Sequence, residues 1–370
     1  MIPVNAPLLD GLEEQYLVEC IGSGWISSEG PWVKQFETRF AARVARRFGV
    51  AISSGSSALE TAVAALDLSP GDEVILPTFT IISCAAPIVR AGATPVLVDC
   101  DPCTWNMTPA SVEAAITPRT RAIMVVHLYG LPVDMDPVLA LARRHRLKII
   151  EDAAEAHGQT YKGHPCGSFG DISTFSFYPN KNLTTGEGGM LVTDDEKLAE
   201  RCRSLRNLCF QPDKRFVHEE LGWNFRMTSL QAALGLAQLE RFDEFALRKR
   251  RMGARYSELM SDLSGLQLPL ARTAYAENAY WVYGLVVKDE VPFAAEEAMR
   301  QLAKLGVETR PFFWPMHEQP VFRRMGLFRA EHYPVAERIA RRGFYLPSGL
   351  ALTDEQIGQV SEAMHKVFHE

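Results

Sequence analysis

The stretch "EVILPTFTIISCAAPIVRAG" (Glu73–Gly92) contains a short apolar strand pattern that is followed directly by a helical pattern. The same order of patterns recurs through the first two thirds of the chain. Further strand-like runs end at Ser54, Asp99, His127, Asp152 and Phe177, and another follows Gly189. Apolar strands separated by helices are typical of a parallel sheet that is covered on both faces. The sequence therefore predicts an α/β fold with a mostly parallel, doubly wound sheet.

The pattern changes near Thr228, where a long helical region begins and continues to about residue 263. One strong strand pattern follows at Tyr280–Val287, together with helical patterns near 294–305, 334–342 and 354–368. This mixture is typical of a smaller α+β domain. We expect a large domain over 1–245, which includes the N-terminal segment, and a small C-terminal domain over 246–370.

The composition limits the class of protein. The chain has 370 residues, of which 47% are hydrophobic and 23% are charged, and its formal net charge is −6. This charge predicts no general attraction to nucleic acid or to an anionic membrane surface. The seven cysteines form an odd set without the density of a disulfide framework, and the N-terminus lacks the pattern of a signal peptide. We expect a reduced, cytoplasmic protein.

Ligands bind at the carboxyl ends of the strands in an open parallel sheet, so the residues after each strand are the first candidates for a site. Ser53–Ser57 follow a strand and open a helix, where free backbone N–H groups and hydroxyls can bind an anion. The alternative is a plain capping box with Ser57 as N-cap and Glu60 three residues later. The spacing matches neither a Walker loop nor a G-x-G-x-x-G fingerprint.

Titratable side chains gather after two further strands. Asp152 ends one strand, and Glu155 and His157 follow it closely. Lys181 lies after another strand, in the otherwise uncharged run from Ser173 to Gly186. A partly desolvated lysine at a strand end can have a lowered pKa and can form a Schiff base.

An anion site, a carboxylate and a lysine at one sheet edge meet the requirements of pyridoxal 5'-phosphate (PLP). The phosphate of PLP needs a helix N-terminus, its pyridine nitrogen needs a carboxylate, and its aldehyde needs a lysine. The sequence therefore predicts a PLP site that contains Asp152 and Lys181.

Other candidate motifs have simpler interpretations. Cys100 and Cys103 form a C-x-x-C in a loop, but a zinc site would need two more ligands. The basic run Arg248–Arg255 is typical of a solvated helix face. His317 lies in an aromatic, proline-rich loop, where a packed histidine is the plain interpretation.

The blocks of sequence around these positions resemble the sugar aminotransferases of the DegT/DnrJ/EryC1/StrS family. The resemblance runs through nearly the whole length. It is carried by "GWISSEGPWVKQFE", "SSGSSALETAVAAL", "GDEVILPTFT", "GATPVLVDCDP", "VVHLYGLPVDMDP", "IIEDAAEAHG", "GSFGDISTFSFYPNKNLTTGEGGM" and "GWNFRMTSLQAALGLAQLERFDE". It implies the type I PLP fold, which is the fold of aspartate aminotransferase.

The resemblance also implies roles for individual residues. Lys181 would bind the PLP aldehyde, and Asp152 would pair with the pyridinium nitrogen. Glu155 stands where many relatives have a glutamine near the phenolic oxygen of PLP. The remaining implied contacts are Ser56, Ser57 and Ser176 to the phosphate, Asn224 to the same phosphate from a second subunit, and Trp25, Ser27, Arg310 and His317 to the sugar nucleotide.

One position departs from the family pattern. The residue after Thr80 is usually aromatic and stacks on the pyridine ring, whereas here it is Ile81. The side chain can still pack on the ring, but it gives up stacking worth about 1 kcal/mol. A local shift of Phe79 is one way to replace the missing aromatic ring.

Within the family, the chain looks most like the branch that aminates C4 of GDP-4-keto-6-deoxymannose. The resemblance implies a homodimer with shared active sites, L-glutamate as amino donor and a sugar for the lipopolysaccharide O-antigen. Three alternatives remain: a UDP- or dTDP-linked keto sugar as substrate, a sugar dehydratase and a non-catalytic regulatory protein. The dehydratases typically carry histidine where this chain has Lys181, and no separate DNA-binding motif is evident.

Overall fold

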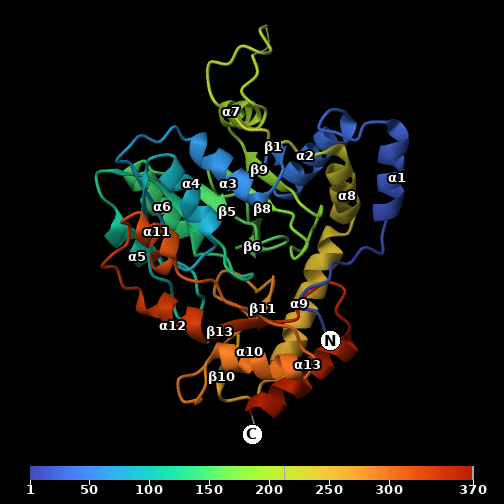
Figure 1. Cartoon of the computed structure of the whole chain (residues 1–370), viewed down its shortest axis with the longest axis vertical. Coiled ribbons are helices and arrows are strands. Elements are labelled where there is room, and N and C mark those ends of the chain that lie inside the picture. Colours follow the sequence, from blue (N-terminus) through green and yellow to red (C-terminus); the bar gives the residue numbers. More distant parts are fainter. Residues whose placement is uncertain (212, 369–370) are drawn as a thin grey trace.

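A seven-stranded sheet forms the centre of the computed structural model, which describes residues 1–211 and 213–368 (Figure 1). The strand order is β1-β9-β8-β5-β4-β2-β3. The strands are β1 (Phe48–Ile52), β2 (Glu73–Pro77), β3 (Thr94–Val98), β4 (Thr120–Val126), β5 (Lys148–Asp152), β8 (Ile172–Ser176) and β9 (Gly189–Thr193). Strand β9 is antiparallel to both neighbours, and the other four pairings are parallel. The predicted mostly parallel sheet is confirmed.

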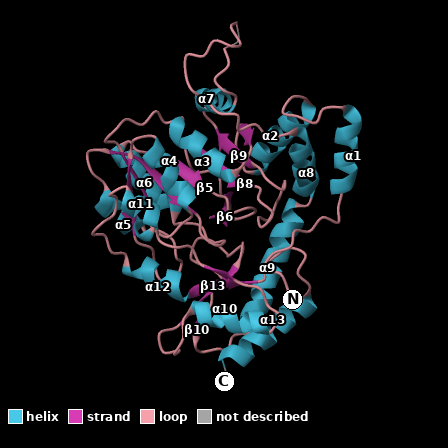
Figure 2. Cartoon of the chain, viewed as in Figure 1, coloured by secondary structure: helices cyan, strands magenta, loops and turns pink. Residues whose placement is uncertain are grey.

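Both faces of this sheet are covered by helices, as Figure 2 shows. Successive side chains of a strand point to opposite faces. In β1, Val50 and Ile52 pack in one apolar cluster with residues of α3, α4 and α7, whereas Ala51 packs in another with residues of α2 and α8. The helices of the large sheet are α1 (Glu13–Ser23), α2 (Pro31–Arg43), α3 (Gly55–Ala64), α4 (Ile82–Arg90), α5 (Pro109–Ala115), α6 (Met135–His145), α7 (Glu196–Arg206) and α8 (Ser229–Glu240). Apolar side chains on both faces explain why the strands read as continuous apolar runs.

The helical region predicted from Thr228 is divided into two helices. Helix α8 ends at Glu240, and α9 (Phe242–Leu259) begins after Arg241. Arg241 has φ −105° and ψ 14°, which interrupts the first helix without a glycine or proline. This break redirects the chain from the large sheet into the C-terminal part of the molecule (Figure 1).

The C-terminal part contains a second, antiparallel sheet with the order β10-β11-β13-β12. After α9, the elements of the C-terminal part are β10 (Leu266–Gln267), β11 (Tyr283–Val287), α10 (Ala295–Lys304), β12 (Arg310–Pro311), η1 (Met316–Glu318), α11 (Pro320–Arg324), α12 (Pro334–Arg342), β13 (Gly343–Leu346) and α13 (Asp354–Phe368). The start of the chain lies here too, because Ile2 pairs with Val307 and Ser348 N–H donates to Val4 O. We propose that the boundary between the two domains falls inside α9, at about residue 245.

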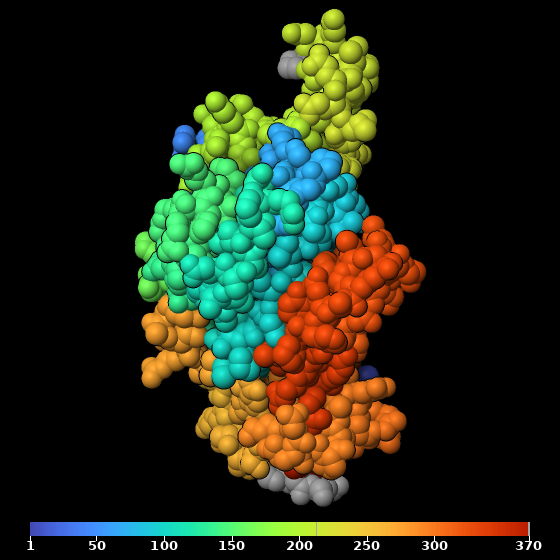
Figure 3. All heavy atoms as spheres, turned by 90° about the vertical axis from the view of Figure 1, so that its left-hand side faces the viewer, coloured from blue at the N-terminus to red at the C-terminus, as the bar shows by residue number. Residues whose placement is uncertain are grey.

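Two further features complete the chain. Strands β6 (Thr160–Tyr161) and β7 (His164–Pro165) form a short hairpin. The described residues between α7 and α8, 207–211 and 213–228, project from the body of the molecule, at the top of Figures 1 and 3. Among the described residues, no helix combines the length and the apolar character that crossing a membrane requires.

Candidate active site

A pocket of about 390 Å³ lies at the carboxyl ends of the parallel strands, where an open sheet of this kind binds ligands. One wall consists of residues that end or follow β2, β4, β5 and β8, and the opposite wall comes from the C-terminal part. The strand side includes Thr80, Ile81, His127, Asp152, Ala154, Glu155, Ser176 and Lys181, and the opposite side includes Trp281, Phe313 and Tyr345. The site therefore depends on both sheets.

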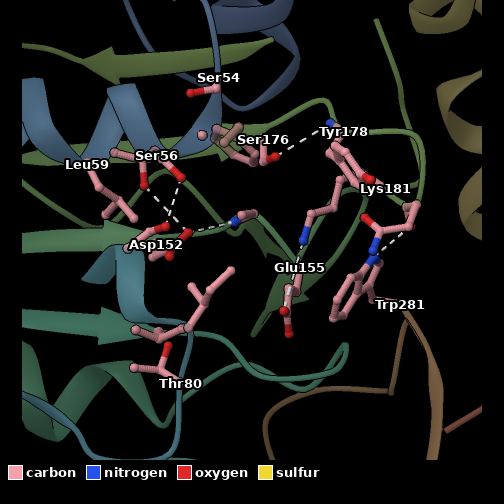
Figure 4. Close-up of a pocket in the computed structure, with 18 of the residues that line it drawn as sticks. Ser54, Ser56, Leu59, Thr80, Asp152, Glu155, Ser176, Tyr178, Lys181 and Trp281 are labelled. Atoms are coloured by element: carbon pink, nitrogen blue, oxygen red, sulfur yellow. Dashed lines mark hydrogen bonds and ion pairs between the residues drawn. The ribbon is translucent and has the colours of Figure 1, made fainter. Parts of the chain in front are cut away.

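Lys181 projects into this pocket from the loop between β8 and β9 (Figure 4). Its N–H donates to Tyr178 O at 2.9 Å, and this turn returns the chain toward the sheet. The side chain is 11% exposed, and Nζ lies 3.9 Å from Glu155 Oε1. Burial lowers the pKa of the Lys181 amine, although the nearby carboxylates of Glu155 and Asp152 oppose this effect. A lower pKa makes more of the free, nucleophilic amine available at neutral pH.

Asp152 is the last residue of β5 and is 3% exposed. Ala154 N–H donates to its Oδ1 at 3.0 Å, and the Cys84 thiol donates to its Oδ2 at 3.4 Å. Burial raises the pKa of Asp152, against the hydrogen bond from Ala154 and the charge of Lys181. Within the described residues, no lysine or arginine nitrogen lies within 4.0 Å of its oxygens. The buried carboxylate is thus only partly compensated by the protein.

Glu151 precedes Asp152 but points to the opposite side of the strand and is fully compensated. It accepts hydrogen bonds from the backbone N–H groups of Gly167, Phe169 and Gly170, from the Ser173 hydroxyl, and from His127 Nε2 at 3.0 Å. Burial alone would raise its pKa, but these donors lower the pKa of Glu151 to about 2. Glu151 therefore has a structural role on the side of β5 opposite Asp152.

An anion cradle lies at the first turn of α3. Ser54 is the N-cap: its hydroxyl accepts from Ser57 N–H, and Ser57 Oγ accepts from Ser54 N–H. The N–H groups of the first turn have no partner within a helix, so those of Gly55 and Ser56 are available to an anion. Ser56 Oγ, which lies 2.8 Å from Ser83 Oγ, adds a hydroxyl.

The capping box therefore consists of Ser54 and Ser57, and the alternative box of Ser57 and Glu60 is wrong. Ser57 is 6% exposed and lies in the cap, outside the lining of the main pocket. Gly55 is required by the close approach of Ser176, because a Cβ on Gly55 would lie 2.6 Å from Ser176 Cβ. This approach brings the Ser176 hydroxyl to the helix N-terminus.

Glu155 is 7% exposed and lies beside Lys181. Tyr129 N–H donates to its Oε2 at 2.9 Å. Burial raises the pKa of Glu155, while Lys181 and the Tyr129 N–H oppose the shift. His157, by contrast, packs among Phe40, Phe175 and Phe177, and burial lowers its pKa to about 3, so its ring is neutral.

Ile81 lies in the pocket wall and is 44% exposed. Phe79 does not replace the missing aromatic ring, because it is fully buried against Tyr129, Phe312 and Phe313. Ile81 is thus the side chain in this part of the pocket wall that could pack against a flat ring.

The structure does not bring the other predicted contacts to this pocket. Trp25 and Ser27 lie between α1 and α2, and Arg310 is exposed and pairs with Glu308 at 2.7 Å. His317 is 1% exposed, with Nδ1 2.8 Å from Thr78 Oγ1 and Nε2 3.0 Å from Glu337 Oε1. Asn224 is exposed and accepts from Arg226 Nε at 2.8 Å. None of these five predicted residues lines the pocket of its own chain.

The residues present fit PLP. The cradle of Gly55, Ser56 and Ser176 suits a phosphate, because it combines N–H and hydroxyl donors with the positive end of a helix dipole. The partly compensated charge of Asp152 suits a pyridinium nitrogen, and the buried amine of Lys181 suits an aldehyde.

Several residues of the pocket carried no clear signal in the sequence. Ser54 and Gly55 stood inside the predicted anion site, but their roles in the cap and in the close approach depend on three-dimensional packing. Trp281, Phe313 and Tyr345 come from the C-terminal part, and no local pattern connects them with Lys181.

The fold and this set of residues define a PLP-dependent enzyme of the aspartate aminotransferase type. The DegT/DnrJ/EryC1/StrS aminotransferase family model matches residues 7–365, and the chain belongs to that family. Its members are PLP-dependent sugar aminotransferases.

Three curated relatives illustrate the similarity. GDP-perosamine synthase of Caulobacter vibrioides is 42% identical over 99% of this chain and 98% of its own, and that of Escherichia coli O157:H7 is 40% identical over 99% and 98%. The UDP-N-acetyl-3-dehydro-alpha-D-glucosamine 3-aminotransferase of Acidithiobacillus ferrooxidans is 40% identical over 87% of this chain and 84% of its own.

Solved structures agree with these relatives. An aminotransferase from Psychrobacter cryohalolentis has a TM-score of 0.92 at 32% identity and covers 99% of both chains. The PLP form of the putative sugar aminotransferase Spr1654 from Streptococcus pneumoniae has a TM-score of 0.92 at 28% identity, over 100% of this chain and 98% of its own. The aminotransferase fold and the cofactor expected from the sequence are confirmed.

Proposed function

We propose that this enzyme transfers the amino group of L-glutamate to C4 of GDP-4-keto-6-deoxy-D-mannose and forms GDP-perosamine. The observation that carries the chemistry is the buried pair of Lys181 and Asp152 at the strand ends, next to the anion cradle of α3. The substrate is supported by the full-length similarity to two GDP-perosamine synthases. The product would be a sugar for a surface polysaccharide such as the O-antigen.

PLP, when bound, supplies an electron-withdrawing ring that lowers the energy needed to remove a proton from the carbon next to the amino group. Gly55 N–H, Ser56 and Ser176 would bind its phosphate. Asp152 keeps the ring nitrogen protonated, because its buried carboxylate is stabilised by a cation. Glu155, beside Lys181, would lie near the phenolic oxygen, as the family resemblance implies.

Lys181 moves the protons. Its Nζ would take the α-proton of glutamate and deliver it within the same half of the cycle, which is the proton shift that transamination requires. In the second half of the cycle the same amine delivers a proton to C4 of the sugar. Burial lowers the pKa of Lys181, which favours the free base needed for the first transfer. Trp281, Phe313 and Tyr345 exclude water from the opposite side.

We also propose a homodimer in which Asn224 of one subunit reaches the phosphate site of the other. Asn224 does not line the pocket of its own chain. The segment between α7 and α8 exposes Phe216, Val217 and Leu221, whose exposed fractions are 82%, 54% and 92%. Exposed apolar side chains on a projecting segment are typical of a surface that is buried in an assembly.

All seven cysteines are free, which supports a reducing, cytoplasmic location.

The experiment that tests the proposed substrate is a panel of GDP-, UDP- and dTDP-linked 4-keto-6-deoxy sugars with L-glutamate. The measurement is the release of 2-oxoglutarate, together with the mass of the amino sugar nucleotide. We expect the highest kcat/KM with the GDP-linked sugar. The 40% identity to an enzyme named for a UDP-linked sugar favours the second candidate, a UDP-sugar aminotransferase. A preference for the UDP-linked substrate would establish that candidate instead.

A further inference from the structure

Trp281 lies against the amine of Lys181. The Lys181 Nζ is 3.8 Å from the centroid of the indole ring, and Trp281 is 4% exposed. Figure 4 shows the ring beside the lysine, whose amine points toward Glu155. A cation over an indole face is attracted by the ring quadrupole, and the attraction is strongest where water is excluded.

The position of the indole is fixed by contacts that do not involve the Lys181 amine. Its Nε1–H donates to Asn180 O at 2.8 Å, so the ring is tied to the residue that precedes Lys181. The backbone oxygen of Trp281 accepts from Lys249 Nζ at 2.6 Å, and the same buried Lys249 also donates to Ser348 O. Side-chain and main-chain contacts thus hold Trp281 from both sides, and the amine meets a ring that is already in place.

We propose that Trp281 is a positioning residue that holds the protonated amine of Lys181 beside Glu155 whenever this amine is not bonded to the cofactor. The free lysine side chain has four rotatable carbon–carbon bonds, and a fixed ring limits the positions that its amine can take. The amine therefore stays in the pocket between successive proton transfers. This inference rests on the proposed role of Lys181 as the lysine that binds PLP.

Other titratable groups around the Lys181 amine also influence its protonation. Burial lowers the pKa of Lys181, and the carboxylates of Glu155 and Asp152 raise it. Cys84 and His157 also interact electrostatically with the amine, and the pocket lining adds the titratable side chains of His127, Tyr178, Glu187 and Tyr345. The indole interacts favourably with the protonated amine, and Trp281→Leu or Trp281→Phe would keep an apolar side chain in the wall that excludes water, so loss of the indole should lower the pKa of Lys181.

The test measures the protonation of Lys181 directly in the cofactor-free protein. Lysines are labelled briefly with acetic anhydride at a series of pH values, and mass spectrometry quantifies the label on the peptide that contains Lys181. The pH midpoint of labelling reports the protonation of the amine, and the plateau at high pH reports its accessibility. The variants are Trp281→Leu and Trp281→Phe. Trp105→Leu is the control, because Trp105 is also nearly buried, at 3% exposed, but packs on Tyr129 and Phe312.

We expect the midpoint of Trp281→Leu to move to lower pH, with roughly three- to thirtyfold more labelling of Lys181 below the midpoint. The midpoint of Trp281→Phe should move in the same direction by less, because the phenyl ring still attracts the cation, but more weakly than indole does. If Trp281→Leu does not fold, Trp281→Phe alone provides the test. Trp105→Leu should keep the wild-type midpoint. A wild-type or higher midpoint in both Trp281 variants would overturn the proposal.

A separate measurement tests the proposed role of Lys181 itself. Borohydride added to the PLP-loaded protein should fix a pyridoxyl phosphate group on Lys181, as detected by peptide mass spectrometry. Failure to find this group would refute the role of Lys181 in cofactor binding, whereas the labelling midpoints would still report the contact with Trp281.

Discussion

Replacement of Gly55 by alanine should weaken the binding of PLP through its phosphate. A Cβ at this position would lie 2.6 Å from Ser176 Cβ and 3.0 Å from Ser176 Oγ. Ordinary van der Waals contact begins at 3.4 Å, so the start of α3 and the end of β8 must separate by roughly 0.8 Å. The backbone of Gly55 does not itself forbid a side chain, because its φ lies outside the left-handed range.

This separation acts on the cradle that should hold the phosphate. A hydrogen bond to a charged group contributes about 1.5–3 kcal/mol, and a displacement of this size is enough to lose one. We therefore expect PLP to bind roughly ten- to hundredfold more weakly in Gly55→Ala. The affinity for pyridoxal, which has no phosphate, should stay near its wild-type value.

The assay is a titration of cofactor-free protein with PLP and with pyridoxal, followed by absorbance and by thermal unfolding. Gly358→Ala is the matched control, because a Cβ there would meet no atom within 4 Å and the residue lies inside helix α13. The control should keep both affinities and unfold at the same or a higher temperature. If Gly55→Ala bound PLP within twofold of the wild-type affinity, the proposed phosphate-binding role of the cradle would be refuted. An equal loss of affinity for PLP and for pyridoxal would refute it as well.

Three further predictions concern the cofactor ring, the second subunit and the core. Ile81→Tyr should raise the affinity for PLP about fivefold, through stacking worth about 1 kcal/mol. The control Ile82→Tyr changes the next residue, which lies outside the main pocket, and should leave the affinity unchanged. Equal PLP affinities of the two variants in a titration would contradict this prediction. Lys181→Ala and Asn224→Ala should each have impaired activity alone. A mixture that exchanges subunits should recover about a quarter of wild-type activity, because half of the dimers then contain one intact site. No recovery would indicate that Asn224 acts in the active site of its own subunit. The pKa of Glu151 falls from 4.5 to about 2 on folding, so its ionised form stabilises the fold above about pH 4.5 and this contribution is lost as the pH falls toward 2. Glu151→Gln should accordingly be less stable than wild type by about 3 kcal/mol at pH 7 and nearly equal at pH 2 in thermal unfolding, and a gap that does not depend on pH would contradict the assignment.

Local sequence patterns were sufficient for the sheet and for its ligand edge. The strand pattern at the start of Glu73–Gly92 was predicted from the sequence, and β2 occupies Glu73–Pro77. Strands covered on both faces leave a strong local signal, because most of their side chains are apolar. The rule that ligands bind at the carboxyl ends of parallel strands then led to Asp152 and Lys181, and the pocket contains both.

Local patterns failed where the outcome depends on distant packing. The alternative to the anion site was a capping box of Ser57 and Glu60, but Ser54 is the N-cap of α3, because several hydroxyl residues in a row fit more than one register. Trp281 could not be connected with Lys181, since a hundred residues separate them and only the folding of the C-terminal part brings them together. His317 is the packed histidine that its loop suggested, with its ring bonded to Thr78 and Glu337 outside the pocket lining, and the sugar-nucleotide contact implied by the resemblance stays a prediction.

The segment "EDAAEAHG" (residues 151–158) shows how burial separates groups that the sequence only gathers. Glu151, Asp152, Glu155 and His157 are all nearly buried, and each pays a desolvation penalty when charged. Glu151 has its donors within the protein, and His157 avoids the penalty by staying neutral. Glu155 has Lys181 at 3.9 Å, whereas Asp152 has hydrogen bonds but no cation within ion-pair distance among the described residues. A carboxylate in that state is best stabilised by a cationic partner from outside the chain, and a pyridinium nitrogen is the one that the neighbouring lysine and anion cradle would bring to it.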